Sequence, residues 1–567
     1  MNELLPLPVI LPLFGAGATL MLSRRPQAQR AVSSTVLAAV AAVSAVLLVQ
    51  TDRDGPQVMW VGAWPEPLGI SLVADRLSAL MLLVSSLVTL AVLAYSIGQG
   101  MTGDSREKTP VSIYHPTFLV LVAGVSNAFL AGDLFNLFVS FEMLLFASYV
   151  LLTLGGTGPR VRAGTIYVVV SLMSSALFLL TIAVVYAATG ALNLAQLAGR
   201  LQEIDPGVAL LIQLLLLTTF AIKAAIFPLS FWLPDSYPTA PAPVTAVFAG
   251  LLTKVGVYAI LRVQTLLFPD EPLTDLLLWV ALATMVIGIL GAIAQSDIKR
   301  MLSFTLVSHI GFMVFGIGLA TEAGVSGAIF YVAHHITIQT ALFLVVGLIE
   351  RRAGSTALLR LGGLARLSPM IAVMFFVPAM NLAGVPPLSG FLGKVGLLQA
   401  GLDAGTPLAH VLVAGGVLTS LLTLYAVAKT WSLAFWRTPE QAHETAAALR
   451  AGEGSSPSGS EIVRHHDHVH VGIATFGSRD LDEAERVHDG DDPVRDLHQL
   501  LADDALPPEV PRSMTVPTVG LIAAGLLLTL VAGPLFGYTD RAAADLLDRT
   551  PYLSAVLGST PADGADR

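Results

Sequence analysis

The amino-acid sequence predicts an all-α membrane protein with many transmembrane helices. Hydrophobic residues make up 54% of the 567 positions, charged residues only 13%, and the mean hydropathy is +0.74. A soluble domain carries about 25% charged residues, so a polytopic membrane protein is the class that fits this composition. The chain contains no cysteine, which excludes disulfides, iron–sulfur clusters and thiolate metal sites.

Apolar runs long enough to cross a bilayer follow one another along the chain. A spanning helix needs about 20 residues, and about fourteen runs meet that length. The runs near 207–231 and 369–400 are longer, and prolines interrupt both (Pro228, and Pro386 with Pro387). The predicted helices lie near 4–22, 31–50, 73–97, 115–131, 134–155, 164–188, 207–231, 243–266, 275–294, 301–320, 325–349, 369–400, 408–436 and 515–536.

Basic residues in the short connections predict how the helices are oriented in the cell membrane. One set of alternate connections holds about three times as many Lys and Arg as the other, so we expect that set in the cytoplasm. Both termini are then outside. The first apolar run lacks a basic segment and a cleavage site, so we expect it to be a retained helix. The sparsely charged set contains Arg53, Arg76, Arg200 and Arg262.

The acidity of the chain is confined to the stretch 438–512, which this orientation puts in the cytoplasm. The stretch holds about 16 Asp and Glu against about 6 Arg, whereas the whole chain has a net charge of −9. It is poor in aromatic residues and partly rich in Ser and Gly, so we predict that it is largely disordered. Its run HHDHVH is a weak candidate for a divalent metal site, because exposed histidine tracts more often bind nothing. The histidines of this run are His465, His466, His468 and His470.

Three lysines and one glutamate fall inside otherwise apolar runs. They are Lys223, Lys254, Lys394 and Glu142. A charge at mid-membrane costs about 3 kcal/mol, so each should face the protein interior or water. Lys223 and Lys394 lie on the proline-interrupted segments, and buried charges on broken membrane helices indicate an ion pathway.

Glu142 and Lys223 have two interpretations. A static ion pair would only fix helix packing. A coupled pair would carry protons, since two unit charges 4 Å apart interact by about 4 kcal/mol at an effective dielectric of 20, and moving Glu142 away would release the lysine's proton. We favour the coupled pair because Lys223 precedes Pro228 by only a few residues. Lys254 lies near the middle of its run, whereas Lys394 lies where its side chain could also snorkel to the membrane surface.

Histidines fill the sequence between these lysines. His334 and His335 are adjacent in one apolar run, and His309 lies in the run before it. Histidine titrates near neutrality and can give or take a proton, although a membrane histidine is often only a structural hydrogen-bonding group. Neighbours on a helix point about 100° apart, so we expect only one of the pair to face a pathway, with a slight preference for His334. Asp235 is a secondary candidate that could instead shape a turn.

Four long motifs resemble the D subunit of the Mrp-type multisubunit Na⁺/H⁺ antiporters. They are HPTFLVLVAGVSNAFLAGDLFNLFVSFEMLLFASYVLLTLGG, IKAAIFPLSFWLPDSYPTAPAPVTAVFAGLLTKVGVYAI, QSDIKRMLSFTLVSHIGFM and AGVPPLSGFLGK. The resemblance is strong over about 110–437. The family shares its fold with the antiporter-like subunits of respiratory complex I and of membrane-bound hydrogenases.

The resemblance implies fourteen helices, with helices 4–8 and 9–13 as inverted five-helix repeats and helices 7 and 12 broken. It implies that Glu142 and Lys223 are the coupled pair, that Lys254 with His334 or His335 is the central relay, and that Lys394 is the terminal relay. It also implies no cofactor in this chain, partner subunits in a hetero-oligomer, and transport of H⁺ and Na⁺. The corresponding division is 1–110, 111–266, 270–437, 438–512 and 513–567, with the insert 438–512 departing from the family pattern.

Two other classes remain open. The first is a proton-pumping membrane subunit of an NADH–quinone oxidoreductase or hydrogenase, against which the motifs PPLSGFLGK and LPDSYPTAP and the lysine at 394 weigh. The second is a scaffold subunit without a pathway of its own. A scaffold would gain stability by losing buried charges, so their presence weighs against it. No nucleotide-binding loop occurs, so the driving force must come from an ion gradient or a partner.

Overall fold

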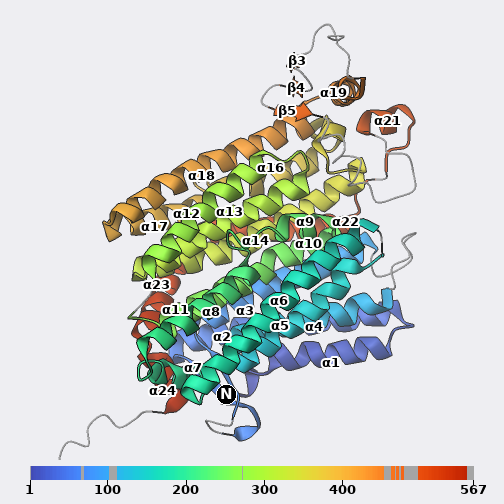
Figure 1. Ribbon diagram of the computed structural model, residues 1–567. Coiled ribbons are helices and arrows are strands. Elements are labelled where there is room, and N and C mark those ends of the chain that lie inside the picture. Colours follow the sequence, from blue (N-terminus) through green and yellow to red (C-terminus); the bar gives the residue numbers. More distant parts are fainter. Residues whose placement is uncertain are drawn as a thin grey trace, which may run out of the picture.

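One helix, α14 (Glu322–Ala353), lies at the centre of the bundle and contacts elements from both halves of the chain. It packs against α3 (Arg76–Gln99) and α10 (Ala242–Val247) on one side and against α13 (Ile298–Gly318) and α17 (Ser389–Ala404) on the other. The long helices run side by side at a common tilt (Figure 1). This computed structural model describes residues 2–64, 69–100, 111–156, 158–270, 273–451, 462–465, 468–471, 474–477, 496–507 and 509–558.

The described residues are overwhelmingly helical, as the composition predicts. The other long or apolar helices are α1 (Leu7–Met21), α2 (Pro26–Asp54), α4 (Val111–Leu130), α5 (Leu134–Thr153), α6 (Gly158–Thr189), α8 (Pro206–Ala224), α11 (Thr253–Leu266), α12 (Thr274–Ile293), α16 (Pro369–Ala383), α18 (Pro407–Trp431), α22 (Arg512–Leu530) and α23 (Ala532–Asp548). Short helices are η1 (Asn2–Leu4), η2 (Val61–Ala63), α7 (Leu194–Arg200), α9 (Leu233–Ser236), η3 (Tyr237–Thr239), η5 (Leu358–Arg360), α15 (Leu364–Leu367), α19 (Pro439–Ala451), α21 (Leu497–Ala502) and α24 (Thr550–Leu557). The segments η4 (Phe248–Leu252) and η6 (Ser432–Trp436) are π-helical.

Two small antiparallel sheets complete the described structure. Strand β1 (Gln57–Trp60) pairs with β2 (Ser71–Ala74), and Gln57 stands opposite Ala74. The second sheet has the order β3 (Ile462–His465), β4 (His468–Val471) and β5 (Ala474–Gly477).

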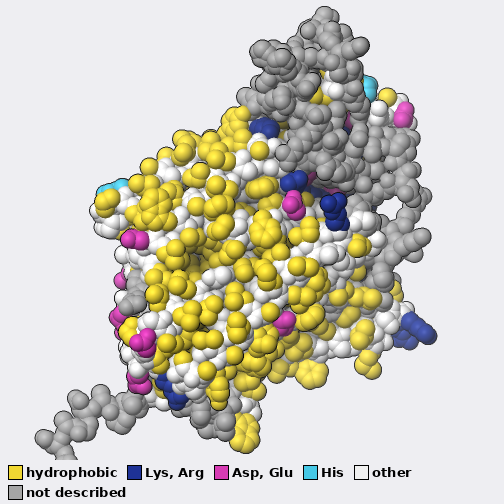
Figure 2. Space-filling view, in the orientation of Figure 1, with side chains coloured by type: hydrophobic (Ala, Val, Ile, Leu, Met, Phe, Trp, Pro, Cys, Tyr) yellow, Lys and Arg dark blue, Asp and Glu magenta, His cyan; other side chains and the backbone are white. Residues whose placement is uncertain are grey.

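Twelve helices within the described ranges are long and apolar enough to cross a membrane. The shorter apolar helices α1 and α16 fall within the predicted runs near 4–22 and 369–400. Figure 2 shows hydrophobic side chains over the broad face of the bundle, with most charged side chains toward its edges. The polytopic all-α fold is therefore confirmed, while the number of membrane crossings and the orientation stay predictions.

Both proline-interrupted segments are broken helices. Helix α8 ends at Ala224, and Ala225 then takes a left-handed conformation with a φ of 57°. Helix α16 ends at Ala383, and Gly384 follows with a φ of 87°, a conformation that glycine adopts without a steric penalty. The helical hydrogen-bonding pattern is therefore interrupted inside the bundle at two places.

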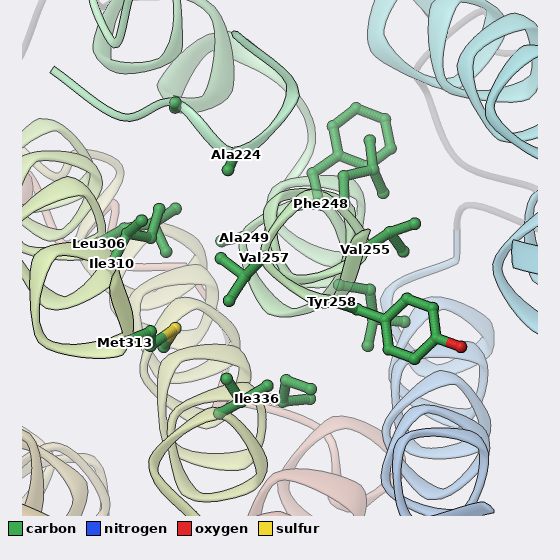
Figure 3. Close-up of a cluster of buried hydrophobic side chains, with 14 of the residues drawn as sticks. Ala224, Phe248, Ala249, Val255, Val257, Tyr258, Leu306, Ile310, Met313 and Ile336 are labelled. Atoms are coloured by element: carbon green, nitrogen blue, oxygen red, sulfur yellow. The ribbon is translucent and has the colours of Figure 1, made fainter. Parts of the chain in front are cut away.

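Helix α11 is enclosed by close packing. Apolar side chains from α8, η4, α13 and α14 surround it (Figure 3). Gly256 permits this approach, because a Cβ atom there would lie 2.7 Å from the backbone nitrogen of Ala224. Any charged side chain on this stretch of α11 is thus held away from lipid.

Two expectations from the sequence differ from the structure. Arg262, which the sequence places in a connection, lies buried within α11 and forms an ion pair of 2.6 Å with Asp75. The stretch 438–512, expected to be largely disordered, contains helices α19 and α21 and the backbone of β3–β5. Sequence reasoning missed α19 because acidic and small residues dominate it, and α21 because its apolar run has only six residues.

Candidate functional site

Lys223 is the first along the sequence of a set of buried lysines and histidines, which we call the row: Lys223, Lys254, His309, His334, His335 and Lys394. Lys223 is the second-last residue of α8, so the break follows it directly rather than several residues later. Its side chain is buried, and its Nζ donates to the hydroxyl of Ser175 at 3.0 Å and to the carbonyl of Ser171 at 3.4 Å, both on α6. The ammonium also lies 5.6 Å from the centre of the Phe141 ring, within cation–π range.

Glu142 is the acidic group that acts on Lys223. It follows Phe141 on α5, and its charge attracts the ammonium electrostatically. The buried Oε1 atom of Glu142 has no hydrogen-bond partner among the described residues, and the two side chains do not form a direct ion pair there. Glu142 therefore acts on the ammonium through its charge and not through a direct contact.

A small cavity adjoins Lys223. It encloses about 20 Å³ open to the centres of water molecules, which is room for about one water. Ser171, Tyr167, Trp232 and Tyr237 line it together with apolar side chains. A water in a cavity of this size beside the ammonium can carry a proton to or from the lysine.

Trp232 adds a hydrogen bond to a carbonyl at the break of α8 that also accepts one from the N–H of Ala225 at 3.2 Å. Its indole N–H donates to the carbonyl of Ile222 at 3.2 Å. On the far side of the break, the N–H of Phe227 donates to the hydroxyl of Thr284 at 3.2 Å. Because other side chains meet these demands, Lys223 is not needed to cap its own helix.

Lys254 lies in the middle of the continuous stretch Ala242–Leu266, as the sequence predicts. It is fully buried, and its Nζ donates to the carbonyl of Ala249 at 2.6 Å. Ala249 belongs to the π-helical turn η4, and such turns in α-helices occur frequently at functional sites. No carboxylate pairs with Lys254 in the described part of the chain.

Three histidines form a cluster between Lys254 and Lys394. The rings of His309 and His335 lie 5.2 Å apart, and Tyr331 donates or accepts a hydrogen bond of 2.9 Å with Nδ1 of His309. Both lysines act electrostatically on His335. Neither ring nitrogen of His335 has a hydrogen-bond partner among the described residues, so both are free for proton exchange.

His334 faces a different neighbour from His335. Its Nδ1 lies 3.0 Å from the hydroxyl of Ser389, the first residue of α17. Its ring lies 5.5 Å from that of Tyr331, so it remains in contact with the cluster. Both adjacent histidines lie near the Tyr331 ring, and the expectation that only one of them faces a pathway stays a prediction.

Lys394 ends the row. Its side chain is 3% exposed, and its Nζ donates to the carbonyls of Leu382 at 3.2 Å and Ala383 at 3.1 Å. These are the last residues of α16, so the lysine caps the broken helix. The side chain points inward, which removes snorkelling as an explanation for its position.

The remaining candidates lie apart from this row. Asp235 is on the surface and pairs with Arg300 at 3.0 Å. The side chains of the run 465–470 lie outside the described residues. Sequence reasoning also missed Ser175, Tyr331 and Ser389. The one feature that could have identified them is a hydroxyl group within an apolar helix.

A membrane bundle with buried titratable groups on two broken helices places the chain in the class of ion-transport folds. The chain belongs to a family described as NADH:quinone oxidoreductase/Mrp antiporter, TM, whose family model matches residues 131–423.

Relatives at the level of sequence are consistent with that family. The chain is 37% identical to the D subunit of a Na(+)/H(+) antiporter from Alkalihalophilus pseudofirmus, over 98% of this chain and all of the relative. It is 39% identical to the protein of the same name from Bacillus subtilis, over 79% of this chain and 91% of the relative. The resemblance to this antiporter component is thereby confirmed.

Solved structures of protein complexes contain chains with the same fold. A chain of the Mrp complex from Dietzia sp. DQ12-45-1b superposes with a TM-score of 0.82 at 33% identity, covering 98% of this chain and all of that one. A chain of respiratory complex I from Thermus thermophilus shares the fold, with a TM-score of 0.71 at 22% identity, covering 96% of this chain and 99% of that one.

Proposed function

We propose that this chain is the proton-translocating subunit of a multisubunit Na⁺/H⁺ antiporter in the cell membrane. The observation that carries the proposal is the row of buried lysines and histidines that runs from Lys223 on α8 to Lys394 on α17. Buried charges are costly in a membrane protein and usually mark ion pathways. The names of the relatives agree with this function, and the partners are then the other subunits of the complex.

The proton route begins at the pair of Glu142 and Lys223. Attraction to Glu142 favours the charged form of Lys223, and displacement of the carboxylate favours loss of a proton from the ammonium. The adjacent cavity gives that proton a polar exit. The hydroxyl of Ser175 accepts a hydrogen bond from the ammonium and holds it in place.

The central part of the route runs through Lys254 and the histidine cluster. Lys254 hands a proton to His335, which experiences the charge of Lys254 and whose ring lies 5.2 Å from that of His309. The Tyr331 hydroxyl links to His309, and its ring contacts both His334 and His335. His334 then passes the proton toward Lys394.

The alternative is a membrane subunit of a redox-driven proton pump such as an NADH–quinone oxidoreductase or a hydrogenase. The support for this alternative is the fold that the chain shares with a complex I subunit. A purified complex that contains this chain should catalyse antiport without oxidising NADH or hydrogen. Redox-coupled proton uptake by that complex would favour the alternative.

The direct test uses the assembled complex in everted membrane vesicles. Glu142→Gln and Lys223→Ala should abolish the Na⁺-dependent collapse of a pH gradient, with normal assembly in the membrane. Glu203→Gln is the matched control, because Glu203 is exposed. Full antiport by either of the first two variants would contradict the proposed pathway.

A further inference from the structure

The two ends of the 438–512 insert meet on the bundle. Helix α19 packs against α21 and against η5, the short helix after α14. Ala442, Ala446 and Leu497 are buried in this contact region. The insert thus has a docked base that holds side chains in fixed positions.

Two histidines and an aspartate converge at this base. Nδ1 of His443 on α19 lies 2.6 Å from Oδ2 of Asp496 at the start of α21. The ring of His498 stacks on that of His443, with centroids 4.9 Å apart. One ligand atom from each of the three side chains lies within 4.8 Å of the others.

Asp496 is held in place by the helix that it begins. Its Oδ1 accepts a hydrogen bond from the N–H of Gln499, and the Gln499 side chain accepts one from the N–H of Asp496. This capping box leaves Oδ2 directed at His443. The helix start therefore presents one carboxylate oxygen in a fixed direction.

The Asp496 carboxylate also lacks a permanent positive partner. Its side chain is 7% exposed, and the only side chain that forms an ion pair with it in the described structure is that of His443. A buried carboxylate needs a compensating charge. A neutral imidazole cannot supply one, whereas a divalent cation can.

We propose that His443, Asp496 and His498 bind a divalent transition-metal ion, with Zn²⁺ as the best match. Two imidazole nitrogens and one carboxylate oxygen suit Zn²⁺, which binds such ligands at about 2.0–2.2 Å. Binding replaces the proton between His443 and Asp496 and requires His498 to turn out of its ring stack. The fourth position is open to water.

The ion would join parts of the chain that are 53 residues apart in sequence. Helix α19 packs against η5, which follows α14, the helix that carries His334 and His335. A metal at this point closes the long connection between them and restricts its conformations. The site would thus fasten the two ends of the insert to each other beside η5.

The test measures metal binding to the purified full chain in detergent after chelator treatment, using Co²⁺ absorption and competition with Zn²⁺. We expect one tightly bound ion per chain. His443→Ala and His498→Ala should each weaken Zn²⁺ binding at least tenfold. Asp496→Asn should do the same while preserving the helix cap, because asparagine caps as well as aspartate.

Matched controls separate this site from the neighbouring histidine run. Replacing His465, His466, His468 and His470 with alanine should leave the tight ion in place. If that variant loses the ion while His443→Ala keeps it, or if no ion binds at all, the proposed site is wrong. Unchanged gel filtration of each variant excludes unfolding, and the readout does not depend on antiport.

Discussion

The lysines at the two helix breaks, Lys223 and Lys394, have different hydrogen-bond partners. At the end of α8, the carbonyl of Ile222 accepts from the indole of Trp232 and from the N–H of Ala225, while Lys223 donates to Ser175 and is attracted by the charge of Glu142. At the end of α16, Lys394 itself donates to the last two carbonyls. Lys394 therefore caps the end of its broken helix, whereas Lys223 does not.

This difference assigns different parts to the two breaks in the proposed pathway. Lys223 has a cavity beside it and a carboxylate that is near but not in contact, so its proton can be controlled from outside the helix. Lys394 must abandon backbone carbonyls when it moves, which ties proton transfer to the geometry of the break. We infer that the first break is the point of control and the second is the point of delivery.

Lys394→Ala should have the largest combined effect. It should abolish antiport and also destabilise the protein, because a buried polar group left without a partner costs about 1–3 kcal/mol. Lys223→Ala should abolish antiport equally, with a stability within about 1 kcal/mol of wild type, since no backbone carbonyl of its own helix is orphaned. Thermal unfolding of the two purified variants separates these outcomes. Equal stability of both would remove the proposed distinction between the breaks.

The adjacent histidines should differ in the severity of their loss. His335→Ala should reduce antiport by about 100-fold, the lower range for a positioned proton-transfer group, because both of its nitrogens lack partners and it experiences the charge of Lys254. His334→Ala should cost about tenfold, because Ser389 and water can replace part of its contact. His410→Ala, at an exposed position, is the control for initial rates. A silent His335→Ala variant would exclude this residue from the relay.

Trp232→Phe tests whether the hydrogen bond from the indole to the Ile222 carbonyl keeps Lys223 from capping its own helix. Loss of the N–H should cost about 1 kcal/mol and open one acceptor position of the Ile222 carbonyl to the lysine, while the N–H of Ala225 keeps the other. The first break would then resemble the second, and antiport should fall several-fold without being lost. Initial rates at saturating Na⁺ measure this effect, and wild-type rates together with wild-type stability would show that the indole has no such part.

Shortening the insert should have the smallest effect on transport. Replacing 453–494 with a short Gly/Ser linker removes β3–β5 but keeps α19 and α21, so antiport should change by less than about twofold, as is usual for surface connections. Loss of activity in an assembled complex would reveal a direct role for the removed residues.

The sequence predicted the fold better than it predicted the contacts of the candidate residues. Apolar run length and interrupting prolines are local properties, so the long helices and both breaks were visible. The hydrogen-bond partners of Lys254 and Lys394 are backbone carbonyls, and these cannot be inferred from the types of the residues that carry them. Ser389 meets His334 only because α17 restarts at that serine, and the phase of a helix cannot be fixed from its sequence.

In the proposed mechanism Lys223 releases its proton during transport, and Lys223→Arg tests this step most directly. Arginine keeps the charge and can bond Ser175 but does not deprotonate in proteins, so antiport by the assembled complex should be abolished. Lys299→Arg is the control, because Lys299 forms an ion pair of 2.7 Å with Glu350 that arginine can replace. Wild-type antiport by Lys223→Arg would show that the charge at this position is static and would contradict the proposed mechanism.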